Sequence, residues 1–168
     1  MSDDERNGLL AAAIGLREQG RTEAARDRLV ELAARWPQDA EVAYQTAWAH
    51  DVLGLEAEAV PYYERALTAS RTGLSEEDRR GALLGLGSTF RVLGRYEEAV
   101  ATLRGAVEEF PDDGALRTFL AMALFNTGDH HESARLLLRL VAATSDDASV
   151  RRYRPAIEYY AEDLDATV

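Results

Sequence analysis

The fold is decided by residues 83–111, LLGLGSTFRVLGRYEEAVATLRGAVEEFP. Two apolar helical patterns are separated in this stretch by Gly94 and closed by Pro111. Glycine recurs through the chain at intervals of 34, 40 and 34 residues, at Gly20, Gly54, Gly94 and Gly128. Pro37 and Pro111 each follow one of these glycines by 17 residues. Glycine can end a helix in a left-handed conformation and let the chain reverse, so this spacing predicts stacked helical hairpins.

The same stretch resembles the tetratricopeptide repeat, whose 34-residue signature runs W-x2-L-G-x2-Y, then A-x3-F, then P. The matching residues, in order, are Leu83, Leu86, Gly87, Phe90, Ala99, Leu103 and Pro111. Four units share this register, at about residues 6–39, 40–73, 80–113 and 114–147. The resemblance implies an all-α, right-handed α-solenoid of four helix-turn-helix units in a single domain over residues 1–168. The chain is similar to small stand-alone bacterial members, which share no common biochemical activity.

Two segments depart from the repeat. The long glycine interval leaves six extra residues at 74–79, where Ser75 precedes three acidic residues as a helix N-cap would. The insert is therefore expected to lengthen a helix, with a disordered loop as the alternative. The second segment carries an apolar stripe of Tyr153, Ile157, Tyr160 and Leu164. It predicts a capping helix at about residues 149–165, which Pro155 should either begin or kink.

Composition indicates which partners the chain would bind and in which cellular compartment it would lie. The net charge of −11 disfavours binding to nucleic acid or to an anionic membrane surface. The chain contains no cysteine, which removes disulfides, thiolate nucleophiles and the common zinc frameworks. The amino terminus is acidic, and no apolar run approaches the roughly 20 residues needed to cross a bilayer. We therefore expect a cytoplasmic protein that binds neither nucleic acid nor membrane.

No residue pattern indicates catalysis. Gly85-Leu86-Gly87 lacks the third glycine of a phosphate-binding loop and follows no strand, so close helix packing is its interpretation. His130 and His131 could bind a metal only if other ligands converged, and adjacent helical side chains diverge by about 100°. His50 stands where the signature has an aromatic residue, which predicts a packed core histidine. We expect no catalytic, cofactor-binding or metal-binding residues, and a metal-dependent enzyme is the least favoured alternative.

In the family, the first helix of each unit lines an inner, concave face. The residues that helical spacing places on its non-packing stripe are Leu10, Ile14, Arg17, Tyr44, Trp48, Asp51, Leu84, Ser88, Arg91, Thr118, Met122 and Phe125. Some members clamp a terminal carboxylate with polar residues here, but Leu10 and Ile14 occupy the first two positions, so the clamp is not expected. The apolar stripe instead suits an apolar or amphipathic segment, with Tyr44 and Trp48 as anchors. Arg17 or Arg91 would orient an acidic group of that partner.

Two alternatives compete with this groove. Its residues could pack against adjacent helices or against the chain's own carboxy-terminal segment, because buried aromatic residues usually belong to a core. They could also form the interface of a homodimer, since an exposed apolar patch often marks a subunit contact. The sequence thus predicts a non-catalytic module that binds a protein or peptide, and it does not identify the partner.

Overall fold

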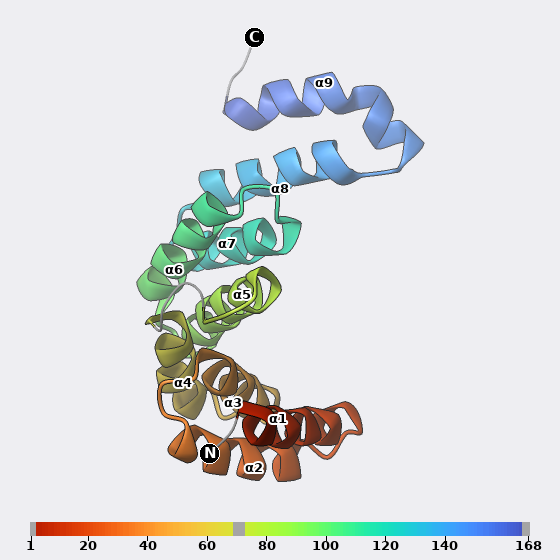
Figure 1. The fold of residues 1–168 in the computed structure, drawn as a ribbon. Coiled ribbons are helices and arrows are strands. Elements are labelled where there is room, and N and C mark those ends of the chain that lie inside the picture. The colour runs from red at the N-terminus through yellow and green to blue at the C-terminus, as the bar shows by residue number, and fades with distance from the viewer. Residues whose placement is uncertain (1–2, 69–72, 166–168) are drawn as a thin grey trace. The chain divides into compact units, whose positions relative to one another are not determined.

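In the computed structural model, residues 3–68 and 73–165 are described. These ranges hold nine α-helices and no strand, which confirms the expected all-α helical repeat (Figure 1). The helices are α1 Asp3–Glu18, α2 Thr22–Arg35, α3 Ala40–Val52, α4 Glu56–Thr68, α5 Glu76–Val92, α6 Tyr96–Glu109, α7 Gly114–Asn126, α8 His130–Thr144 and α9 Ala148–Glu162. They fall into two compact units, unit 1 Met1–Gly94 and unit 2 Arg95–Val168. None of the described helices is long and apolar enough to cross a membrane.

The recurring glycines take the left-handed conformation that their spacing predicted. Their φ angles are 78° at Gly20, 70° at Gly54, 73° at Gly94 and 87° at Gly128. No other described residue has a positive φ. Each glycine stands between two consecutive helices, so the turn of each hairpin depends on a residue without a Cβ.

The ends of the repeats are also built alike. Pro37 and Pro111 each lie two residues beyond the end of a helix, and neither can continue it. Asp39 then caps α3 by accepting a hydrogen bond from the Val42 amide at 2.9 Å. Asp113 caps α7 in the same way through the Leu116 amide at 3.0 Å. These local bonds satisfy amides that a helix start leaves without a partner.

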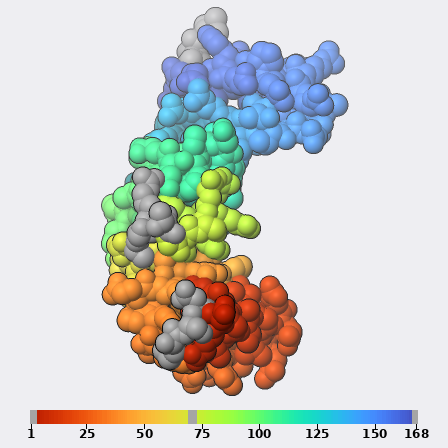
Figure 2. Space-filling model, viewed as in Figure 1, coloured from red at the N-terminus to blue at the C-terminus, as the bar shows by residue number. Residues whose placement is uncertain are grey.

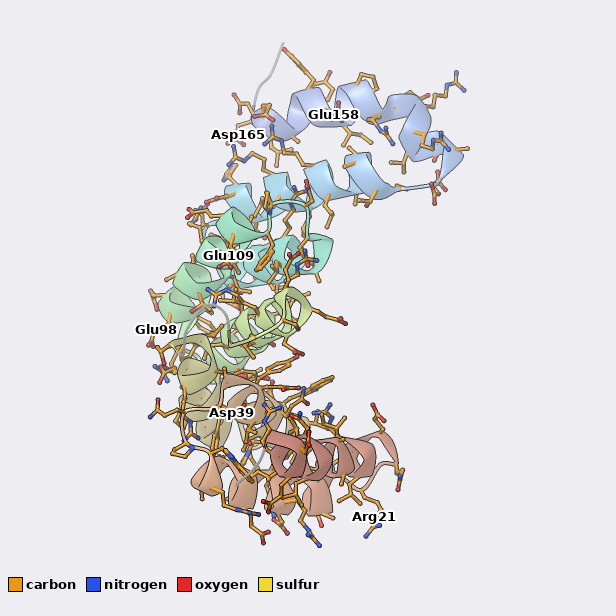
Figure 3. The ribbon with its side chains drawn as sticks, viewed as in Figure 1. Arg21, Asp39, Glu98, Glu109, Glu158 and Asp165 are labelled. Atoms are coloured by element: carbon orange, nitrogen blue, oxygen red, sulfur yellow. The ribbon has the colours of Figure 1, made fainter. Side chains whose placement is uncertain are left out.

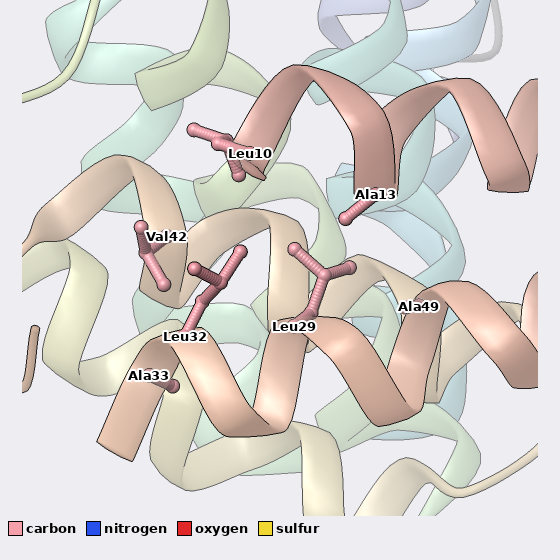
Figure 4. Packing of buried hydrophobic residues seen from close by; sticks show 7 residues of the cluster. All are labelled: Leu10, Ala13, Leu29, Leu32, Ala33, Val42 and Ala49. Atoms are coloured by element: carbon pink, nitrogen blue, oxygen red, sulfur yellow. The ribbon is translucent and has the colours of Figure 1, made fainter. Parts of the chain in front are cut away.

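Unit 1 contains the hairpins α1–α2 and α3–α4, followed by α5. Helices α1, α3 and α5 pack side by side, while α2 and α4 each pack between two consecutive members of that row. Figure 4 shows the amino-terminal part of its core, where side chains of α1 and α2 meet α3. The cluster consists of Leu10, Ala13, Leu29, Leu32, Ala33, Val42 and Ala49.

Helix α5 begins at Glu76 and extends over 17 residues, against 13 for α3. Ser75 is its N-cap, and the Ser75 hydroxyl accepts a hydrogen bond from the Asp78 amide at 3.0 Å. The expected N-cap is therefore confirmed. Residues 69–72, between α4 and Ser75, lie outside the described part of the chain. The repeat boundaries and the single-domain assignment stay predictions.

Unit 2 contains α6 to α9, each packed against the next. Helices α8 and α9 run side by side as the blue segments of Figures 1 and 2. Pro155 lies inside α9, which begins at Ala148 with Asp147 as its N-cap. The predicted apolar stripe is mostly exposed: Tyr153 and Tyr160 of α9 face solvent, as does Leu164, which lies beyond the end of the helix, and Ala161 is buried instead. The capping role of α9 stays a prediction.

A second function of Asp39 is to hold α1 against α3. The Asp39 carboxylate, labelled in Figure 3, accepts hydrogen bonds from Arg6 Nε at 2.8 Å and Arg6 Nη2 at 2.6 Å. Partial burial acts to raise the pKa of Asp39, but the hydrogen bonds from Arg6 and from the Val42 amide outweigh it and lower the pKa. The ionised form of Asp39 therefore stabilises unit 1.

We expect Asp39→Ala to lower the free energy of unfolding by about 1.5 kcal/mol at neutral pH, because a helix cap and a charge-assisted pair are lost together. The folded-state pKa is lowered, so this contribution is present above the unfolded-state pKa of about 3.9 and is lost as the pH falls through the folded-state value. Urea denaturation of both proteins across this range measures the difference. Asp113→Ala removes the matching cap of α7, and a greater loss from Asp39→Ala is expected because Arg6 adds its two bonds.

Candidate functional site

Helices α1 and α3, each the first helix of a hairpin in unit 1, carry a stack of planar side chains. The guanidinium carbon of Arg17, in the last turn of α1, lies 3.7 Å from the centroid of the Trp48 ring on α3. Trp48 stacks on Tyr44, one turn earlier in α3, with ring centroids 5.9 Å apart. Arg17 Nη1 also donates a hydrogen bond of 2.6 Å to Gln45 Oε1. These contacts hold Trp48 in one orientation although 41% of it is exposed.

Two glycines of α5 make room for Tyr44 of this stack and for Tyr63 of α4. A Cβ at Gly81 would lie 3.0 Å from Tyr44 Cζ and still closer to the Tyr44 hydroxyl. A Cβ at Gly85 would lie 2.5 Å from Tyr63 Cζ and 2.8 Å from Tyr63 Cε1. Both tyrosine rings therefore lie against the α5 backbone itself. The interpretation of Gly85 as a close-packing residue is confirmed.

The Asp51 side chain connects three helices of unit 1. Its carboxylate on α3 accepts hydrogen bonds from Tyr63 of α4 and Thr89 of α5, each at 3.0 Å. Burial raises the pKa of Asp51, and the two hydrogen bonds offset this only in part. Burial likewise raises the pKa of Tyr44, to about 12, with the charge of Asp78 as the next contribution. Burial raises the pKa of Tyr63 as well, so both tyrosines are neutral at physiological pH, and Tyr63 donates to Asp51.

Unit 2 has an exposed apolar surface on α7, the first helix of the hairpin α7–α8. Met122 is 40% exposed and Phe125, three residues later, is 60% exposed. Residues three apart on a helix lie on the same side, so these two side chains are neighbours. The Phe125 ring contacts the exposed His130 ring, with centroids 4.7 Å apart.

The predicted groove residues have three different fates. Those with exposed side chains are Trp48, Met122 and Phe125, and those that are half-buried are Ile14, Arg17, Asp51, Leu84, Ser88, Arg91 and Thr118. Tyr44 is buried beneath Trp48. Leu10 was expected on the open stripe and is instead only 2% exposed, because α1 turns it toward α2 and α3 in the core. Leu10 therefore does not line a surface.

The histidines have the surroundings that the sequence indicated. His50 is buried, stacks on Tyr62 and donates from Nδ1 to the Thr46 carbonyl oxygen at 2.8 Å, which confirms a packed core histidine. His131 is exposed, with Nε2 2.8 Å from Asp165 Oδ2. Within residues 3–68 and 73–165, no cluster of three or more histidine, aspartate or glutamate side chains could hold a metal ion.

Sequence reasoning missed two parts of the site. Gln45, which holds Arg17, lies three residues before Trp48, so helical spacing could have placed both on one side of α3. The hydroxyls of Tyr63 and Thr89 that hold Asp51 come from other helices and have no local signal. Asp51 is recognised as the partner of both hydroxyls only in the packed arrangement of α3, α4 and α5.

A family model described as Tetratrico peptide repeat matches residues 40–164. The chain belongs to the tetratricopeptide repeat family. The match covers most of the chain, including all helices from α3 to α9. Tetratricopeptide repeats stack into an extended surface that holds other proteins, so the architecture is that of a protein–protein interaction module.

Solved structures with the same fold come from proteins of several kinds. The MamA protein of Desulfovibrio magneticus RS-1, in a form named 41-end, has a TM-score of 0.74 at 18% identity, with 97% of this chain and 88% of that chain covered. PilF of Pseudomonas aeruginosa has a TM-score of 0.68 at 19% identity, with coverages of 99% and 78%. An O-GlcNAc transferase of Thermobaculum terrenum has a TM-score of 0.69 at 19% identity. That match covers 87% of this chain but only 28% of the transferase. At these identities the likeness shows the tetratricopeptide fold alone.

Proposed function

We propose that this chain is a non-catalytic module that binds an apolar or amphipathic segment of another protein. Binding would use the first helices of the hairpins, with Trp48 as the anchor of a surface within unit 1 and Met122 with Phe125 as a separate surface within unit 2. The observation that carries the proposal is Trp48, a large aromatic side chain that is 41% exposed yet held by Arg17 and Tyr44. A side chain that is already ordered loses little conformational freedom on binding, which favours affinity.

The surface on α7 supports the same function by different chemistry. Met122 and Phe125 are exposed neighbours, and methionine adapts its shape to irregular apolar partners. Exposed apolar side chains also occur elsewhere, among them Leu137 and Val141 of α8 and Tyr159 of α9. Trp48, Met122 and Phe125 lie on the first helices of their hairpins, where the family presents its binding surface. Tyr159 lies on α9, outside those helices. This difference makes Tyr159 a suitable control.

Selection of random displayed peptides on the purified chain tests the proposal, with affinities then measured by isothermal titration. Trp48→Ala is expected to weaken binding of the selected peptides by at least about tenfold, as truncation of an anchoring tryptophan commonly does. Trp48 is partly exposed, so the variant should stay folded, which circular dichroism checks. Tyr159→Ala removes a more exposed aromatic ring outside the proposed surface and should leave affinity unchanged. Equal losses in both variants, or selected peptides that bind Trp48→Ala as well as wild type, would refute the anchor.

Fluorescence provides a second readout of the same contact. The chain has two tryptophans, and Trp36 is partly buried against the core cluster. Trp36→Phe leaves Trp48 as the single tryptophan, so peptide binding at Trp48 should shift its emission and protect it from a small soluble quencher. A homodimer that used this surface would show such protection without peptide, together with a doubled mass in light scattering. That result would replace the proposal by self-association.

A further inference from the structure

Arg17 is a half-buried arginine that has no carboxylate partner among the described residues. Arg6 pairs with Asp39, Arg104 with Glu132 and Arg139 with Glu162, all within 2.8 Å. Among the residues that the structure describes, Arg17 makes no ion pair and bonds only to the neutral amide of Gln45. The chain has 30 acidic residues against 19 arginines, so an unpaired, half-buried arginine is not explained by a shortage of carboxylates.

The N–H groups of Arg17 that are not needed for its bond to Gln45 lie next to the Gln45 side chain, because the two side chains are hydrogen-bonded. A guanidinium has five N–H groups arranged in a planar fork, and the bond from Nη1 to Gln45 Oε1 uses one of them. Gln45 accepts through Oε1, so its Nε2 group is left to donate. Burial lowers the pKa of Arg17, and the neighbouring groups, Tyr44 and Glu18 among them, offset this only in part, so the charge of Arg17 is partly desolvated. A carboxylate is the group that this fork fits in two-point contact.

We propose that Arg17 and Gln45 bind the side-chain carboxylate of one acidic residue in the partner segment, beside an apolar residue that contacts Trp48. This inference rests on the proposed function and names the chemistry of the partner. The occupant is an amphipathic segment with a single aspartate or glutamate next to its apolar anchor. An acidic tract is disfavoured, because a chain of net charge −11 repels a polyanion before contact.

Contact geometry explains why the acidic and apolar residues of the partner should be close together. The Arg17 guanidinium lies on the Trp48 ring, with 3.7 Å between its central carbon and the ring centroid. A carboxylate bound to the edge of that guanidinium would therefore lie beside the exposed part of Trp48. Coulomb attraction over such a short, partly desolvated distance is little screened by salt, whereas the repulsion from the rest of the chain is screened beyond about 8 Å. Moderate salt should therefore preserve binding.

Peptides selected on the wild-type chain test this inference when each is synthesised, with an amidated carboxy terminus, as a glutamate form and a glutamine form. We expect the glutamate form to bind wild type at least about tenfold more tightly, the strength of a charge-assisted hydrogen bond. Arg17→Met should abolish this preference; because it also removes the guanidinium that holds Trp48, the glutamine form should bind more weakly as well, but with a smaller loss than the glutamate form. Arg17→Lys keeps the charge without the planar fork and should retain only part of the preference.

Arg28→Met is the matched control, because it makes the same change of charge at an exposed position of α2. It should keep the full preference for glutamate. An equal preference in wild type and Arg17→Met would overturn the role of Arg17 while the anchor at Trp48 stood. The same peptides made with a free carboxy terminus are a further control. If only these bind wild type more tightly than Arg17→Met, the side-chain assignment would be overturned. The absence of any peptide dependent on Trp48 would overturn the proposed function together with this inference.

Discussion

Gly85→Ala is expected to lower the free energy of unfolding by about 3 kcal/mol, the largest effect that we predict for a single added methyl group. Its Cβ would lie 2.5 Å from Tyr63 Cζ, which is far inside van der Waals contact. Tyr63 cannot move away freely, because it is 2% exposed and its hydroxyl is bonded to Asp51. The strain would therefore pass into the packing of α4 against α5.

Chemical denaturation followed by circular dichroism measures this effect, and Gly15→Ala is its control. Gly15 lies in the interior of α1 of the same unit, and nothing is within 4 Å of a Cβ built there. Alanine favours helix over glycine by up to about 1 kcal/mol, so Gly15→Ala should stabilise the chain while Gly85→Ala destabilises it. Amide exchange should accelerate in α4 and α5 of the Gly85 variant. Stabilisation by both substitutions would contradict the packing of Tyr63 on α5.

Asp51→Ala is expected to lower the free energy of unfolding by about 3 kcal/mol, because it leaves two buried hydroxyl donors without an acceptor. Those hydroxyls belong to Tyr63 and Thr89, on two different helices. Asp51→Asn keeps the shape and one carbonyl oxygen, so its cost should be smaller. The single variants Tyr63→Phe and Thr89→Val each remove one donor, and either should reduce the cost of Asp51→Ala in a double-mutant cycle. Fully additive losses would show that Asp51 does not connect the helices.

The same residue should impose a pH dependence opposite to that of Asp39. The pKa of Asp51 is raised in the folded state, so its neutral form is favoured there. Below the unfolded-state pKa of about 3.9 this preference is fully present, and it is lost as the pH rises through the folded-state value. Wild type should therefore gain stability relative to Asp51→Asn as the pH falls from about 7 to about 4. A difference between the two proteins that stays constant over this range would exclude the raised pKa.

The turns and caps of this fold could be predicted because each depends on neighbouring residues. Gly94 has a positive φ because the hairpin reverses there, and Asp113 caps α7 through an amide three residues ahead. The interval that places Ser75 at the start of α5 is equally visible in the order of residues. Such features need no knowledge of which helix packs against which, so the repeat could be identified before the structure was known.

The candidate site could be predicted only in part, because helical spacing shows which residues share a side of a helix but not what lies opposite. Tyr44 and Trp48 share a side of α3, yet Tyr44 is buried against Gly81 while Trp48 stays partly exposed. Leu10 has the spacing of a surface stripe and lies in the core. Ile14 and Arg17 of the same stripe are half-buried, so among the predicted stripe residues of α1 only Leu10 is fully buried.

By itself, the sequence determined that this chain is an all-α tetratricopeptide repeat, with its turns at four glycines and the start of α5 at the capping residue Ser75. These are short-range effects of backbone conformation and local hydrogen bonds. Only the tertiary structure decided that Arg17 would lie on Trp48 beside Gln45, and that Asp51 would be held by hydroxyls from α4 and α5. Burial, pKa and orientation depend on side chains distant in the sequence, so they are settled only when the helices pack together.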